Sequence, residues 1–191
     1  MSPLFDKLID LAKTRQENRE KLFTGFVEPT YQSFDAAHSN YLASFQKYRD
    51  AIVERSDPTD EDIKQLQGLL LTDSLFHWHI RQSAINEADV LRESKRHDFM
   101  PFIDSITKYF EGPIPGKSDL VKKVNEFVRY ANGARAVLFM ALELLRTSLQ
   151  DGRARSSITV EGLDEIIEWL QSQHAVVQRH YLQAKKKLKV S

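Results

Sequence analysis

The chain contains no cysteine, so disulfides, thiolate metal sites and cysteine nucleophiles are all excluded. This absence fits a reducing compartment. The N-terminus, from Met1 to Asp6, also lacks the basic start and the apolar stretch of a secretory signal. We therefore expect a cytoplasmic protein.

Glycine and proline are scarce, with 7 and 6 residues in a chain of 191. A sheet protein of this length needs more turn residues, so the scarcity favours long helices. No run of about 18 apolar residues occurs, so no membrane-spanning helix is expected. Hydrophobic residues make up 41% and charged residues 28%, which predicts one globular domain over residues 1–191.

The chain has no net charge either, because 27 basic side chains balance 27 acidic ones. The chain as a whole therefore has no general attraction for nucleic acid or for an anionic membrane. Catalytic motifs are also absent: there is no Gly-x-Ser-x-Gly, no P-loop and no Gly-x-Gly-x-x-Gly. These absences favour a non-enzymatic function.

What the chain does contain is a heptad pattern of large side chains in its first half. Their spacings alternate between four and three positions, through Val27, Tyr31, Phe34, His38, Tyr41, Phe45, Tyr48 and Ile52. Such spacing places them on one face of a helix, as in a helical bundle or a coiled coil. Similar stripes recur in three later segments.

The stripes predict an all-α fold, specifically an up-down-up-down four-helix bundle. The long helices are expected near residues 28–55, 60–96, 119–150 and 160–188. Ser118 and Thr159 are the predicted N-caps of the last two helices. A short helix is expected at residues 100–110, inside the second long connection.

A second short helix is predicted at residues 3–23, with Gly25 and Pro29 interrupting the chain after it. We expect segment 1–24 to pack on the bundle or on a neighbouring molecule. It carries more apolar side chains than a free arm should expose, namely Leu4, Phe5, Leu8, Ile9 and Leu11. Self-association as a dimer is therefore predicted.

Three histidines fall at a similar depth of the predicted bundle, namely His38, His77 and His174. Asp35 lies one helical turn from His38, and Asp73 lies one turn from His77. Two interpretations of this polar layer stay open. The side chains can satisfy each other's hydrogen bonds, or they can bind a divalent metal or a small ligand. The Glu-x-x-His pairs of di-iron bundles are absent.

Charge is unevenly distributed along the chain. No acidic residue follows Glu168, whereas five basic residues do: Arg179, Lys185, Lys186, Lys187 and Lys189. The predicted topology adds six more basic residues to that end, namely Arg92, Lys95, Arg96, Lys117, Lys122 and Lys123. It gathers acidic residues at the other end, namely Glu54, Asp57, Asp60, Glu61, Asp62, Asp151, Glu161, Asp164 and Glu165. Compensation of helix dipoles accounts for much of this pattern.

From these observations we expect a non-enzymatic helical bundle that acts through protein–protein contacts, as an adaptor, a regulator or an assembly component. Its partner is another protein or a second copy of the chain. Two alternatives stay open. One is a metal or small ligand at the histidine layer. The other is a polyanion at the basic C-terminal end, although no nucleic-acid-binding motif supports it.

Overall fold

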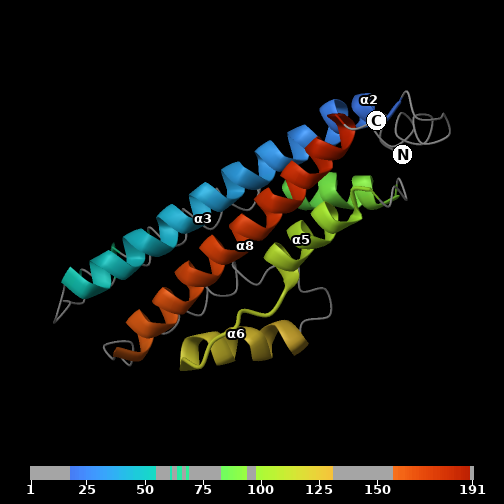
Figure 1. Cartoon of the computed structure of the whole chain (residues 1–191). Helices are drawn as coiled ribbons and strands as arrows, with labels where there is room; N and C mark the ends of the chain where they lie inside the picture. Colours follow the sequence, from blue (N-terminus) through green and yellow to red (C-terminus); the bar gives the residue numbers. More distant parts are fainter. Residues whose placement is uncertain are drawn as a thin grey trace.

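The computed structural model describes residues 18–54, 61, 64, 65, 68, 83–93, 98–130 and 157–189, and only the backbone of 18, 19, 127–130, 157–159 and 189. Every regular element in these ranges is helical, and none of the described residues forms a strand (Figure 1). The predicted all-α class is therefore confirmed for this part of the chain. Leu4 to Leu11, on which the dimer prediction rests, lie outside the described residues.

Two long helices form the frame of the molecule. Helix α3 (Glu28–Glu54) and helix α8 (Ser157–Lys189) run side by side in opposite directions (Figure 1). Their contacts follow an antiparallel register: Glu28 meets Lys185, Asp35 meets His174, and Arg49 meets Asp164. The predicted extents of these two helices agree with the structure to within three residues.

The predicted interruption between residues 23 and 28 is present, but as an irregular helical turn and not as a break in the helix. Helix α2 (Asn18–Leu22) continues through a π-helical segment, η1 (Phe23–Val27), directly into α3. In a regular α-helix the Pro29 ring would clash with the Gly25 carbonyl. The π-helical turn immediately before the proline replaces the regular hydrogen-bond spacing of four residues with one of five. The Glu28 N–H there donates to the Phe23 carbonyl.

Buried side chains flank this irregular turn. Phe23 and Val27, at the two ends of η1, are 2% and 0% exposed. The Thr30 hydroxyl also donates a hydrogen bond to the Phe26 carbonyl, at 2.7 Å. Packing of these apolar side chains therefore outweighs the local preference of proline to end a helix.

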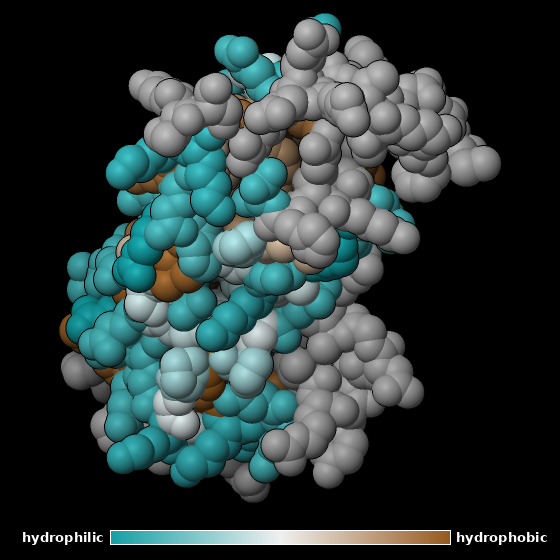
Figure 2. Space-filling view, turned by 45° about the vertical axis from the view of Figure 1, so that its right-hand side comes forward, coloured by the Kyte–Doolittle hydropathy of each residue, from teal (hydrophilic) through white to brown (hydrophobic). Residues whose placement is uncertain are grey.

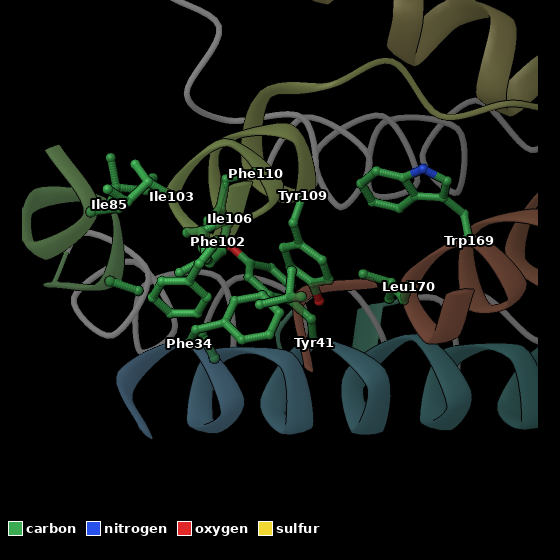
Figure 3. Close-up of a cluster of buried hydrophobic side chains, with 14 of the residues drawn as sticks. Phe34, Tyr41, Ile85, Phe102, Ile103, Ile106, Tyr109, Phe110, Trp169 and Leu170 are labelled. Atoms are coloured by element: carbon green, nitrogen blue, oxygen red, sulfur yellow. The ribbon is translucent and has the colours of Figure 1, made fainter. Parts of the chain in front are cut away.

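Helix α5 (Met100–Glu111) is a core element, although the sequence suggested only a short piece of a connection. Its side chains at spacings of three and four residues are buried, namely Phe102, Ile103, Ile106, Tyr109 and Phe110. Figure 3 shows Phe34 and Tyr41 of α3 pointing toward this face of α5. Trp169 of α8 stacks on Tyr109 with ring centroids 5.7 Å apart, so α5 links the two long helices.

Helix α6 (Asp119–Tyr130) begins at its predicted cap, since the Ser118 hydroxyl accepts a hydrogen bond from the Val121 N–H at 3.3 Å. Glu165 of α8 secures the preceding loop. Its carboxylate accepts hydrogen bonds from the Lys117 N–H at 2.8 Å and from the Ser118 hydroxyl at 2.5 Å. Desolvation raises the pKa of Glu165, but these hydrogen bonds outweigh it and hold the pKa below its usual value.

These contacts correct one expectation about α6. In the predicted topology the third long helix starts beside the C-terminal end of α8, near the terminal lysines. Instead, Lys117 and Ser118 lie against Glu165, in the N-terminal part of α8. Helix α5 runs along α8 and carries the chain to that end before α6 starts (Figure 1). The Lys117 end of α6 is therefore separate from the basic C-terminal residues.

Gly162 allows α8 and α6 to approach closely, so we expect Gly162→Ala to destabilise the protein. An added Cβ would lie 2.7 Å from the Leu120 Cβ and 3.1 Å from the Ser118 hydroxyl oxygen. Overpacking of this kind costs roughly 1–3 kcal/mol, more than the gain of about 1 kcal/mol from alanine's helix propensity. Urea unfolding followed by far-UV circular dichroism measures the difference.

Gly25→Ala is the matched control, because nothing lies within 4 Å of an added Cβ there. It should leave the free energy of unfolding unchanged or raise it by about 0.5–1 kcal/mol. Equal effects of the two substitutions would contradict a steric role for Gly162.

Candidate functional site

The antiparallel register of α3 and α8 brings His38 and His174 into a stacked pair. Their ring centroids are 4.1 Å apart, and the ring planes differ by 14°. His38 is 6% exposed, whereas the side chain of His174 is 22% exposed at the edge of the helix pair. The pair therefore runs from the interior of the molecule toward its surface.

Each imidazole of the pair has one hydrogen-bond partner outside it. The His174 Nε2 atom lies 2.7 Å from the Asp35 carboxylate, to which it donates. The His38 Nδ1 atom lies 3.0 Å from the Tyr109 hydroxyl. Because Tyr109 is fully buried and His38 stays neutral, we assign the phenol as donor and Nδ1 as acceptor. We call these four side chains, Asp35, His174, His38 and Tyr109, the polar layer.

Burial determines the protonation of the inner half of the polar layer. The pKa of His38 is lowered to about 4, chiefly by desolvation and also by the neighbouring His174 imidazole, while Asp35 opposes both effects. Desolvation also raises the pKa of Tyr109 well above its ordinary value. At neutral pH the inner pair is therefore a neutral imidazole bonded to a neutral phenol.

Of the five residues predicted for this layer, the structure brings together His38, His174 and Asp35. His77 and Asp73 lie outside the described residues. Among the residues that are described, no group of three or more His, Asp or Glu side chains is arranged to hold a metal ion. The five-residue metal or ligand site therefore stays a prediction.

The stacking of the two histidines bears on metal binding by this pair. Two imidazoles that share a metal direct their in-plane lone pairs at one point, about 2.0–2.1 Å from each nitrogen. The two rings are 4.1 Å apart and 14° from parallel, so their in-plane lone pairs lie in two nearly parallel planes and do not converge on one point. In this geometry the pair acts as a packing and hydrogen-bonding unit between α3 and α8.

Tyr109 is the member of the polar layer that sequence reasoning missed. Segment 100–110 is predicted only as a short helix inside a connection, which assigns its side chains no depth relative to the histidines. A signal was present nevertheless. Tyr109 shares the apolar face of α5 with Phe102 and Ile106, and a buried phenol requires a hydrogen-bond partner.

The basic C-terminal residues divide into two groups on α8. Lys185 faces α3, with its ammonium 3.7 Å from the Glu28 carboxylate, which also accepts a hydrogen bond from Tyr181 at 3.2 Å. Arg179 and Lys186 are exposed on the outer side of the helix. Lys187 is exposed as well, and the side chain of Lys189 is outside the described residues.

Leu182 lies between Arg179 and Lys186 and is 54% exposed, an exposure that among the described large apolar side chains only Val53 approaches. We call this surface, made of Gln178, Arg179, Leu182, Gln183 and Lys186, the basic face. It borders a shallow depression of about 300 Å³ that Ala175 also lines. Figure 2 shows that the described surface in that view is mainly hydrophilic, with separate apolar areas. An exposed leucine flanked by cations can therefore supply a small contact surface.

Comparisons with protein-family models, with curated proteins and with solved structures gave no match. Within the described part of the chain, none of the helices is both long enough and apolar enough to cross a lipid bilayer.

Proposed function

We propose that this protein is a non-enzymatic helical bundle that acts through protein–protein contacts, and that the basic face of α8 makes the contact. One observation carries this proposal. Leu182 is 54% exposed on a helix whose opposite side is packed, with Val177, Tyr181 and Ala184 at most 7% exposed. A partner that covers this large apolar side chain removes it from water, which stabilises the complex.

The charges beside Leu182 indicate the chemistry of the partner. Arg179 and Lys186 are exposed, and α8 contains no acidic residue beyond Glu168. A partner that carries carboxylates around an apolar side chain would complement this face. Such charges set the association rate and the choice of partner more than the final affinity.

The polar layer supports a ligand-binding function less well. The His174 Nε2 and the His38 Nδ1 are already engaged by Asp35 and Tyr109. Metal binding with His77 and Asp73, polyanion binding at the basic end and a cytoplasmic location all stay predictions. The up-down-up-down order of four long helices is not confirmed, because α6 starts beside the N-terminal part of α8, and the proposed contact does not depend on that order.

Photo-crosslinking tests the contact. A photoreactive residue in place of Gln183, at the edge of the basic face, should crosslink to a discrete protein in cells of the source organism. Arg179→Gln with Leu182→Gln in the same chain should abolish that product. After identification, the purified partner should bind the wild-type protein in a salt-sensitive manner and bind this double variant at least about tenfold more weakly.

A photoreactive residue in place of Glu126 is the matched control, because Glu126 is exposed on α6, away from the basic face. The same crosslinked products from both positions would indicate random collisions. Crosslinks from position 183 that survive the double substitution would place the contact elsewhere.

A further inference from the structure

The second large apolar side chain that is strongly exposed among the described residues is Val53, at 52%. It lies in the last turn of α3, next to the exposed carboxylate of Glu54 and one turn from Asp50. Asp50 forms an ion pair with Arg49, yet its side chain remains 61% exposed. Val53 is therefore an apolar side chain with acidic neighbours.

Helix α8 adds further acidic residues at this place. Arg49 of α3 forms an ion pair with Asp164 of α8, which fixes the register of the two helices there. Glu161 and Glu168 lie one turn to either side of Asp164, and both are exposed. We call the surface formed by Asp50, Val53, Glu54, Glu161 and Glu168 the acidic end.

The acidic end and the basic face lie at opposite ends of the α3–α8 pair. Glu28 meets Lys185 near one end, and Arg49 meets Asp164 near the other. The 21 residues between Glu28 and Arg49 span roughly 32 Å of helix, at about 1.5 Å per residue. One molecule therefore cannot bring its own two surfaces together while these helices stay paired.

We propose, on the basis of the protein-contact function above, that the basic face of one molecule binds the acidic end of a second copy. The two surfaces are complementary in apolar contact and in charge. Leu182 and Val53 each offer one exposed apolar side chain, and Arg179 and Lys186 oppose the carboxylates around Val53. Contact removes both apolar side chains from water and pairs opposite charges.

Charge also selects the geometry of this association. A symmetric contact between two basic faces would place Arg179 and Lys186 against their own copies, and like charges repel. A symmetric contact between two acidic ends meets the same objection. The complementary contact joins two different surfaces, so the assembly is head to tail. An open chain of copies then keeps one free basic face and one free acidic end. Rings or chains of copies follow from such contacts.

Sedimentation velocity of the full chain tests this assembly in low and high salt. Wild-type protein should show an average mass above the 22.1 kDa of the monomer, rising with concentration and falling with added salt. Two double variants each disable one surface without adding charge: Arg179→Gln with Leu182→Gln, and Val53→Gln with Glu54→Gln. Each alone should associate at least about tenfold more weakly than wild type.

Mixing the two double variants is the decisive step. The first keeps the acidic end and the second keeps the basic face, so together they retain one working interface. We expect a one-to-one complex at low salt that does not grow with concentration. Lys123→Gln with Glu126→Gln is the matched control, because both residues are exposed on α6. This control should associate as the wild type does.

Each of the following outcomes would overturn head-to-tail assembly. The first is a wild-type protein that stays monomeric at every concentration. The second is an association that neither double variant weakens, or a mixture that stays monomeric while wild type assembles. The third is wild-type protein that is retained on heparin through Arg179 and Lys186 but does not self-associate, which would make the basic face a polyanion site. If wild type is monomeric but position 183 still crosslinks to another protein, the protein-contact function stands and only the second-copy partner fails.

Discussion

Lowering the pH from 7 to 4 should reduce the free energy of unfolding by roughly 3 kcal/mol through His38 alone. Burial lowers the pKa of His38 in the folded protein to about 4, whereas an unfolded histidine titrates near 6.5. Between these values the unfolded chain binds more protons than the folded one. The contribution of His38 to the free energy of unfolding is therefore fully present above pH 6.5, and it is lost as the pH falls toward 4. Urea titrations at a series of pH values measure this slope.

Carboxylates also titrate in part of this range, so a variant must isolate the histidine. His38→Gln removes the titration but keeps an amide oxygen that can accept the Tyr109 hydroxyl hydrogen bond. The wild-type protein should lose more stability than this variant between pH 6.5 and 4, whatever their difference at pH 7. Parallel pH profiles would show that His38 does not carry the effect.

His174→Gln provides a second, directional control for the polar layer. The His174 imidazole helps to lower the pKa of His38, so its removal should raise that pKa and reduce the acid sensitivity. Nuclear magnetic resonance of the imidazole protons can follow the His38 titration in both proteins. A pKa of His38 that falls further in His174→Gln would contradict the stacked arrangement.

Phe34→Ala should cost roughly 3–5 kcal/mol, the range typical of a large aromatic side chain removed from a core. Phe34 is 0% exposed, and its ring packs edge-on against Tyr109 at 4.9 Å and against Phe110 at 6.1 Å. It also stacks near His174, at 5.8 Å. The substitution therefore leaves a cavity where α3, α5 and α8 meet (Figure 3). Thermal and urea unfolding both report the loss.

Phe26→Ala is the comparison for this core position. Phe26 belongs to the same continuous helix but is only partly buried, at the margin of the core. We expect a clearly smaller loss of stability, because fewer contacts disappear and water already reaches the side chain. Similar losses for the two variants would mean that the Phe34 site collapses without forming a cavity.

Part of the polar layer could be predicted from the sequence, and part could not. Counting residues along the predicted helices placed His38 and His174 at a similar depth, and the structure stacks them at 4.1 Å. The proximity of Asp35 also followed from helical spacing. Spacing could not reveal that Asp35 bonds to His174 on the other helix, because that pairing depends on how α3 and α8 are rotated about their axes. Nor could it place Tyr109, whose helix had no assigned neighbour.

The sequence by itself determined the helical character of the chain and which side of α3 and α8 is buried, because the 3.6-residue period makes both properties local. Tertiary structure decided three matters that depend on distant residues. Burial of Phe23 and Val27 carried the helix through Pro29, packing made α5 a core element, and Glu165 held the start of α6 near the N-terminus of α8. Each outcome rests on contacts between segments far apart in the chain, and local periodicity contains no information about which segments meet.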